Sequence, residues 1–342
     1  MLGRHFRHYT LWTKVGWIGV DLFFVLSGFL ISGLLFTEYQ RHGSIDFWRF
    51  ILRRGLKIWP AYYLLLAVTA VFSLLVCRAQ GIEFQGREIF VSAVFARNFF
   101  GKVGFSYLAH SWSLAVEEHF YFLLPVLLLL LLRVGSCRDP FRSIPSIFAF
   151  IAFASLALRY LAAAHSAAYP SATPLRMDGL FAGVFLGYLH HFHPPWFAKL
   201  TGHYALAICA VCVLPAFVFS AESLPMRTYG VSLLMIGFAF LVAWSVVRQA
   251  QGRIAKLAAK IGFYSYSIYL WHMCLAFPFV TFFKDSALAF WIALPLTITL
   301  GGAMAQLVEI PVLRLRERWT VTATARRPSA VHSRRLEPCP IS

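Results

Sequence analysis

Two adjacent carboxylates at the start of a long apolar run are the strongest chemical signal in the sequence. Glu117 and Glu118 stand in the segment SWSLAVEEHFYFLLPVLLLLLL, residues 111–132. Ser113, Glu117 and Tyr121 are spaced four apart, so they share one face of a helix. An acidic side chain near the centre of a bilayer costs roughly 2.5–3.5 kcal/mol on insertion scales. The two acids are therefore predicted either to lie at the water edge or to face a cavity and transfer protons there.

A third acid, Asp21, begins the apolar segment GWIGVDLFFVLSGFLIS, residues 16–32. Two interpretations stay open for it. Asp21 is either an N-cap, where the helix dipole favours an anion, or a polar group of a reaction site. Small residues along this segment would let another helix backbone approach closely: Gly16, Gly19, Ser27, Gly28 and Gly33.

A basic cluster precedes the next apolar segment. Arg53, Arg54 and Lys57 follow Arg49 in FWRFILRRGLKIWPAYYL, residues 47–64. Such a cluster fixes membrane topology, and the Trp and Tyr residues after it are typical of a membrane interface. Arg also binds phosphate bidentately, so the cluster is equally suited to hold a phosphorylated ligand. The two roles are compatible.

Arg176 and Asp178 stand before a run of glycines in PLRMDGLFAGVFLGYL, residues 174–189. The G-x-x-x-G-x-x-x-G spacing of this run predicts a seam of close helix packing. The Arg–Asp pair at the mouth of the seam is interpreted either as a cap or as a clamp for substrate.

Histidines supply the remaining candidates. His272 shares a helix face with Tyr266 and Tyr269 in YSYSIYLWHM, residues 264–273. It is interpreted either as a hydrogen-bonded packing residue or as a secondary residue of the site. His190, His191 and His193 fall in a short Pro-bounded loop with no accompanying carboxylate or Cys, so no metal site is predicted there. P-loop, G-x-S-x-G and H-E-x-x-H patterns are absent from the sequence.

The composition indicates the class of protein that must position these residues. Of 342 residues, 59% are hydrophobic and 13% are charged, whereas soluble domains are about 45–50% apolar and about 25% charged. We therefore predict an all-α, polytopic integral membrane protein. The net charge of +17 is assigned to loops that set topology and contact anionic membrane lipid, and not to nucleic-acid binding.

Apolar windows of about 20 residues predict nine membrane helices: 16–36, 58–77, 113–132, 144–163, 178–190, 204–220, 229–247, 262–283 and 287–308. They form one membrane domain, residues 1–319, followed by a basic tail, 320–342, that is expected to be disordered. The loops 37–57, 133–143, 191–203 and 248–260 and the segment 309–342 are richer in Lys and Arg than the opposite set, 1–15, 78–112, 164–177, 221–228 and 284–286. This bias places the C-terminus in the cytoplasm. A nine-helix chain that ends inside starts outside, so we expect a tenth helix before Met1.

The motifs together resemble the acyltransferase-3 family of integral-membrane acyltransferases, which O-acylate carbohydrates and other hydroxyl acceptors. The matching segments, in family order, are GWIGVDLFFVLSGFLIS, RRGLKIWPAYYL, SWSLAVEEHFY, RMDGLFAG, YSYSIYLWH and LVEIPVLRLRER. The family has ten membrane helices and an Arg-x10-His motif on the first. The start MLGRHFRHY resembles the end of that helix, which makes His5 the motif's histidine, with His8 as the alternative, and puts its arginine before Met1.

The resemblance implies that an acyl group, acetyl or another short one, passes from cytoplasmic acyl-CoA to a hydroxyl of a carbohydrate or lipid-linked saccharide. It implies a bacterial inner (plasma) membrane location, acyl-CoA as co-substrate and no bound cofactor or metal. His5 would act as general base, oriented by Glu117, Glu118 or Asp21. The donor and substrate would contact Arg53, Arg54, Lys57, Ser113, Tyr121, Arg176, Asp178 and His272. The alternative is a transporter or flippase that moves a lipid-linked saccharide along the same polar groups.

Overall fold

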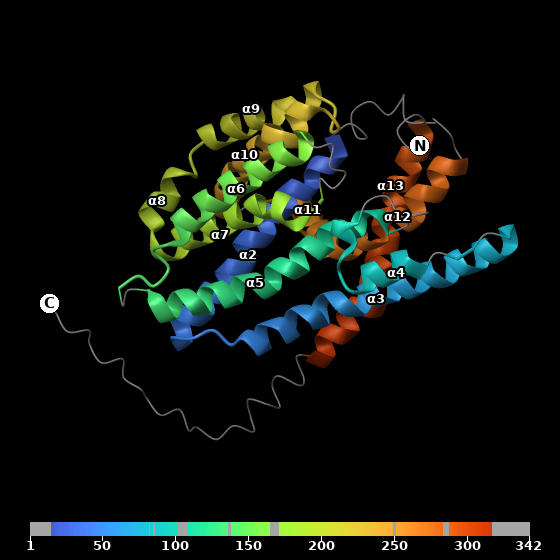
Figure 1. Cartoon of the computed structure of the whole chain (residues 1–342), viewed down its shortest axis with the longest axis horizontal. Helices are drawn as coiled ribbons and strands as arrows, with labels where there is room; N and C mark the ends of the chain where they lie inside the picture. Colours follow the sequence, from blue (N-terminus) through green and yellow to red (C-terminus); the bar gives the residue numbers. More distant parts are fainter. Residues whose placement is uncertain are drawn as a thin grey trace, which may run out of the picture.

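A computed structural model describes residues 15–81, 83–84, 86–100, 108–135, 138–164, 171–248, 251–282 and 287–316. Within these ranges every regular element is a helix, which confirms the all-α prediction for this part of the chain. Figure 1 shows α2 (Gly19–His42) and α7 (Met177–Phe192) near the middle of the bundle. On one side lie α6 (Ile144–Ala164), α9 (Tyr204–Val218) and α10 (Val231–Val246), and on the other α3 (Phe47–Gln80) and α5 (Trp112–Val134).

The other long helices are α12 (Ser265–Phe282) and α13 (Ala287–Met304), which pack against each other. Each of the nine predicted segments coincides with a helix. Six stretches are long and apolar enough to cross a membrane: Gly16–His42, Phe47–Gln80, Ala109–Val134, Ile144–Ala164, Met226–Val246 and Trp291–Arg316. The described residues therefore support an integral membrane protein, while nine crossings stay a prediction.

Short helices connect the long ones. They are α4 (Gly86–Ala93), α8 (Pro194–Lys199), α11 (Arg253–Phe263) and the 3₁₀ turns Gly16–Ile18, Arg97–Phe99, Ala109–Ser111 and Thr173–Leu175. Two wider π-helical turns, η6 (Met226–Gly230) and η7 (Ala305–Glu309), adjoin α10 and α13. Turns of this kind are rare and frequently occur at functional sites.

The helix α3 begins at Phe47 and not at residue 58, so the prediction of a loop up to residue 57 is wrong. Asp46 is its N-cap and accepts a hydrogen bond from the Arg49 amide at 3.0 Å. Gly43, at φ +67°, ends the preceding helix in the left-handed conformation that glycine adopts without strain. The basic cluster is therefore carried on a rigid helix that continues into the apolar span.

The glycine seam of α7 packs directly against α2, as its spacing predicts. A Cβ added to Gly183 would overlap the Val25 carbonyl oxygen, and one added to Gly28 would overlap the Leu180 carbonyl oxygen. The close-packing prediction for Gly16 and Gly19 is wrong, because a Cβ at either position has no neighbour within 4 Å among the described residues. The seam fixes α2 and α7 against each other, and with them the acidic residue at the start of each helix.

Large apolar side chains remain exposed on the outer surface of the bundle, for example Phe150, Phe153, Leu30 and Leu34. A soluble monomer rarely exposes this much apolar surface, whereas a membrane supplies lipid to cover it. Polar side chains, in contrast, gather inside the bundle. The interior of this protein is therefore where its chemistry must be sought.

Candidate active site

Two buried ion pairs join helices at the end of the bundle where α2 and α7 begin. Arg176 Nη2 lies 2.8 Å from Asp21 Oδ1, and Arg159 Nη2 lies 2.7 Å from Asp178 Oδ2. The prediction that Arg176 pairs with Asp178 is therefore wrong, since each of the two binds a partner on another helix. The N-cap interpretation of Asp21 is wrong as well, because α2 begins at Gly19 with Ile18 as its N-cap.

The paired acids lie inside the bundle and not at the water edge. Glu117 and Glu118 are 4% and 5% exposed. Glu117 interacts with the hydroxyls of Ser27 and Tyr121, whose oxygens are 3.2 Å apart. Glu118 turns toward α3 and accepts a hydrogen bond from Trp59 Nε1 at 3.2 Å. One oxygen of each acid, Oε1, has no hydrogen-bond partner among the described residues.

Ser113 belongs to a second polar cluster, between α5 and α12. Its hydroxyl lies 2.5 Å from that of Tyr269, which donates a hydrogen bond to the His110 carbonyl at 2.8 Å. The rings of His110 and His272 are 4.9 Å apart between centroids, and His110 Nε2 bonds the Leu270 carbonyl. Ser113 therefore faces α12, whereas Glu117 and Tyr121 both face Ser27 of α2.

A cavity of about 500 Å³, here called the Lys57 cavity, opens at the end where α3 begins. Its basic lining residues are Arg41, Arg49, Arg53, Arg54, Lys57 and Arg316. The structure therefore brings the predicted cluster Arg53, Arg54 and Lys57 together around one space, and adds Arg316 from the distant end of the α13 segment.

The Lys57 cavity is connected to the buried acids through charged side chains. Arg54 interacts electrostatically with Glu117 and Tyr121. Lys57 interacts with Glu309 of the π-helical turn η7, and Glu309 Oε2 accepts a hydrogen bond from Ser267 at 2.9 Å. Electrostatic interactions thus link the basic cavity to acids in the middle of the bundle.

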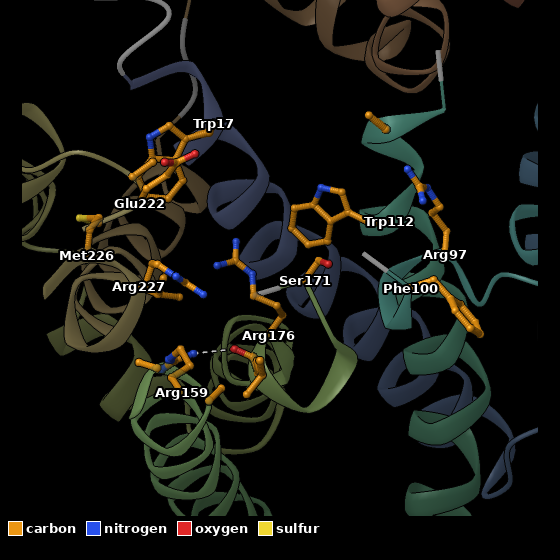
Figure 2. Close-up of a pocket in the computed structure, with 16 residues that line it drawn as sticks. Trp17, Arg97, Phe100, Trp112, Arg159, Ser171, Arg176, Glu222, Met226 and Arg227 are labelled. Atoms are coloured by element: carbon orange, nitrogen blue, oxygen red, sulfur yellow. Dashed lines mark hydrogen bonds between the residues drawn. The ribbon is translucent and has the colours of Figure 1, made fainter. Parts of the chain in front are cut away.

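A second cavity, here called the Trp112 cavity, lies at the opposite end of the bundle and measures about 630 Å³. Figure 2 shows Arg176 and Arg227 directed toward its middle, with Trp17 and Glu222 on one wall and Trp112 on the other. Arg97 and Arg159 also line it. Glu117 and Glu118 line neither cavity, but Glu117 stands on the same helix as Trp112, five residues or about 7.5 Å further along its axis.

Other candidates lie apart from these clusters or outside the described residues. His5 and His8 lie outside them. Among the described residues no three His, Cys, Asp or Glu side chains are grouped as a metal site. The predicted loop at His190–His193 is wrong, because His190 and His191 lie in the last turn of α7. A carboxylate also accompanies these histidines, since His193 Nε2 lies 3.3 Å from Asp139 Oδ2. Tyr188 bonds the same oxygen, so this is a local hydrogen-bonded cluster.

Sequence reasoning missed four residues of these clusters: Arg159, His110, Glu309 and Arg316. Arg159 had a usable signal, since it is a lone arginine within an apolar span, where an ionisable residue marks a partner or a function. Glu309 stands in the quoted segment LVEIPVLRLRER but was given no role. His110 had no signal in its spacing, because its contacts come from α12, far along the chain.

Comparisons with known proteins agree with one another. The family profile described as "Acyltransferase domain" matches residues 4–306. The chain is 30% identical over 330 residues to a Staphylococcus aureus (strain COL) protein named "Putative O-acetyltransferase", a match over 88% of this chain and 53% of that protein. It is 27% identical over 292 residues to "O-acetyltransferase OatA" of S. aureus (strain NCTC 8325), over 79% of this chain and 47% of that protein. The chain thus spans about half the length of these curated relatives, and no solved structure matches it.

Proposed function

We infer that this chain, which belongs to the acyltransferase-3 family, is a membrane O-acyltransferase that moves an acyl group from acyl-CoA to a hydroxyl of a carbohydrate or lipid-linked saccharide. Acetyl is the proposed acyl group, because the relatives described above are named O-acetyltransferases. The protein is proposed to work in a bacterial inner membrane, with the Lys57 cavity facing the cytoplasm.

The observation that carries the proposal is the position of Glu117. It is buried within the bundle, interacts with Arg54 of the Lys57 cavity, and follows Trp112 of the Trp112 cavity on α5. A carboxylate removed from lipid and placed between two cavities is suited to a reaction whose substrates arrive from opposite ends. An acyl transfer between a cytoplasmic donor and an outward-facing acceptor is such a reaction.

The Lys57 cavity is proposed to hold the phosphates of acyl-CoA. Arg53, Arg54 and Lys57 supply positive charge there, and Glu38 is the sole carboxylate among the lining residues that the structure describes. Arginine binds phosphate through paired N–H groups. The nucleotide then stays at the end of the bundle while the uncharged pantetheine arm extends toward Glu117, which avoids moving phosphate charge into lipid.

The transfer step needs a base, because an alcohol is a poor nucleophile at neutral pH. We propose that His5 accepts the hydroxyl proton as the new C–O bond forms at the acyl carbonyl. The C–S bond then breaks, and the CoA thiolate leaves and takes up the proton. Glu117, Glu118 or Asp21 would orient the imidazole, and Asp21 Oδ2 has no hydrogen-bond partner among the described residues.

Donors for the developing oxyanion are proposed among three side chains that reach the bundle interior: Ser113, Tyr121 and Arg176. Tyr121 is buried beside Glu117, and the Ser113 hydroxyl is hydrogen-bonded to that of Tyr269. Asp178 holds Arg159 and His272 packs against His110, so both are proposed to support the site.

The test is thioester consumption by the purified chain in lipid nanodiscs. Acetyl-CoA and a panel of saccharides should release free CoA thiol together with a saccharide that is heavier by one acetyl group, as measured by a thiol reagent and by mass spectrometry. Glu117→Gln should reduce both signals by about 10²-fold or more. Movement of saccharide across vesicles without thiol release would instead establish the transporter alternative and refute the proposal.

A further inference from the structure

We propose that the Trp112 cavity binds an anionic saccharide, with a carboxylate or phosphate held by its arginines and the sugar ring against its tryptophans. This inference rests on the proposed function, since it names the chemical class of the acceptor. It assigns binding roles to Arg227, Trp17 and Trp112, to which no part of the transfer step has been attributed.

The cavity lining carries more guanidinium groups than carboxylates, and three of the guanidinium groups are ion-paired with acids outside the lining: Arg97 with Glu88, Arg159 with Asp178 and Arg176 with Asp21. Arg97, Arg159, Arg176 and Arg227 line the space, and Glu222 is the sole carboxylate among its described lining residues. None of these three acids lines the cavity. They hold the guanidinium groups in place, and the lining itself presents four guanidinium groups to one carboxylate, an arrangement that favours an anion.

Arg159 and Arg176 differ in the donors that they leave for a ligand. Arg159 donates to the Leu175 carbonyl, Asp178 and Ser232, whereas Arg176 donates to Asp21 alone among the described residues. A guanidinium has five N–H donors, so the single hydrogen bond of Arg176 leaves donors for a ligand. A carboxylate or phosphate oxygen accepts from adjacent N–H groups of one guanidinium, so it suits this wall better than a neutral hydroxyl does.

The size and aromatic lining of the cavity indicate that the anion belongs to a larger molecule. A volume of about 630 Å³ lies within the usual range of small-ligand sites, roughly 300–1,000 Å³, and exceeds what a lone phosphate needs. The Trp112 ring lies 5.3 Å from the Arg176 guanidinium, so the two groups are neighbours in the cavity. The flat apolar face of a tryptophan can cover the C–H face of a sugar ring while the arginine holds its charge.

Arg227 makes this arrangement testable, because it is half-buried and stands on the π-helical turn η6. Figure 2 shows its side chain on the wall opposite Trp112. Replacing Arg227 removes one charge from the cavity and leaves the ion pairs of Arg159 and Arg176 intact. Arg78, exposed at the end of α3 and absent from the cavity lining, provides a matched control with the same loss of charge.

The experiment measures binding of glucose, glucuronate and glucose 6-phosphate to the full chain in nanodiscs of uncharged lipid by titration calorimetry. The two anions should bind about ten-fold more tightly than glucose, since a hydrogen bond to a charged group contributes about 1.5–3 kcal/mol. The stronger of the two identifies carboxylate or phosphate as the preferred group. Arg227→Gln should reduce the preference to about three-fold or less, while Arg227→Lys should retain part of it and Arg78→Gln all of it.

Equal binding of glucose and both anions, or an unchanged preference in Arg227→Gln, would overturn the inference. Acetylation of the same three sugars separates this failure from failure of the proposed function. Transfer to all three with equal kcat/KM refutes the anionic acceptor and leaves the acyltransferase proposal standing. Tight anion binding without thioester consumption from any sugar refutes the acyltransferase proposal.

Discussion

Arg176, the residue before α7, reaches Asp21 in the first turn of α2, with 2.8 Å between Nη2 and Oδ1. The pair is buried, and it lies at the same end of the helices as the pair of Arg159 and Asp178. Together the two pairs tie α2, α6 and α7 to one another beside the Trp112 cavity. The same guanidinium therefore holds the helices together and lines the proposed acceptor site.

Loss of one partner of this pair should destabilise the protein strongly. Asp21→Asn leaves the Arg176 charge buried without its carboxylate, and breaking a buried pair in this way typically costs about 3–5 kcal/mol. The double variant Asp21→Asn/Arg176→Gln should be less destabilised than the sum of the single variants, because neither charge is left alone. Unfolding of the four proteins in a mixed-detergent titration measures this coupling, and additive losses would show that the pair makes no net contribution.

Glu117→Gln should reduce kcat by about 10²-fold or more while the thermal unfolding midpoint stays near that of the parent protein. The amide keeps the shape of the carboxylate and its reach to Ser27 and Tyr121, but it neither carries charge nor exchanges a proton at neutral pH. The same measurement on Glu118→Gln tests which of the two acids orients the histidine, because Glu118 accepts its hydrogen bond from Trp59 and not from Ser27 or Tyr121. Glu83→Gln, at an exposed position, is the control; full activity in Glu117→Gln would remove Glu117 from the mechanism.

The basic cluster should act on the phosphates of the donor and not on its thioester. With acetyl-CoA, Arg53→Gln and Arg54→Gln should each raise KM about ten-fold, because a charge-assisted hydrogen bond contributes about 1.5–3 kcal/mol. Acetyl-pantetheine lacks the nucleotide, so its KM in the parent protein should be higher than that of acetyl-CoA. Neither variant should change this KM much. Steady-state kinetics with both donors decides the point, and an equal rise in KM for both would contradict phosphate binding in the Lys57 cavity.

The seam between α2 and α7 should not accept even one methyl group. Gly183→Ala places a Cβ against the Val25 carbonyl and the Phe29 amide, which belong to the backbone and cannot move aside cheaply. We expect a loss of about 1–3 kcal/mol in the free energy of unfolding. Gly302→Ala in α13 is the matched control, since a Cβ there meets nothing within 4 Å, and it should be neutral or stabilising by up to about 1 kcal/mol.

Much of the fold was predictable because lipid leaves the chain few choices. A span in a membrane must be helical and apolar over a fixed length, so the nine predicted segments coincide with helices, and the profile match confirms the family that their motifs resemble. The start of α3 was missed because hydropathy records where a helix enters lipid and not where its hydrogen bonds begin. Asp46 caps α3 well before the apolar residues.

The contacts of the site were less predictable, since they join residues far apart in the sequence. Arg176 stands two positions from Asp178, and proximity suggested a pair, yet Arg176 precedes α7 with a non-helical backbone and its side chain reaches α2 instead. Its partner Asp21 lies 155 positions away. The glycine seam sets the register of α2 against α7 and so decides this pairing, but no spacing rule reveals it. His110 shows the same limit, because its neighbours Tyr269 and His272 come from α12.

The wide turn at Met226–Gly230 constrains the length of the chain at that point. Successive residues of an α-helix point about 100° apart around its axis. The additional residue of the π-helical turn therefore determines which direction Arg227 faces relative to the side chains of α10. Deletion of a single residue there would turn Arg227 away from its cavity or rotate the inward residues Leu234 and Phe238 toward lipid. Homologues with a cavity of this kind should therefore vary in residue type along η6 but show no insertions or deletions within it.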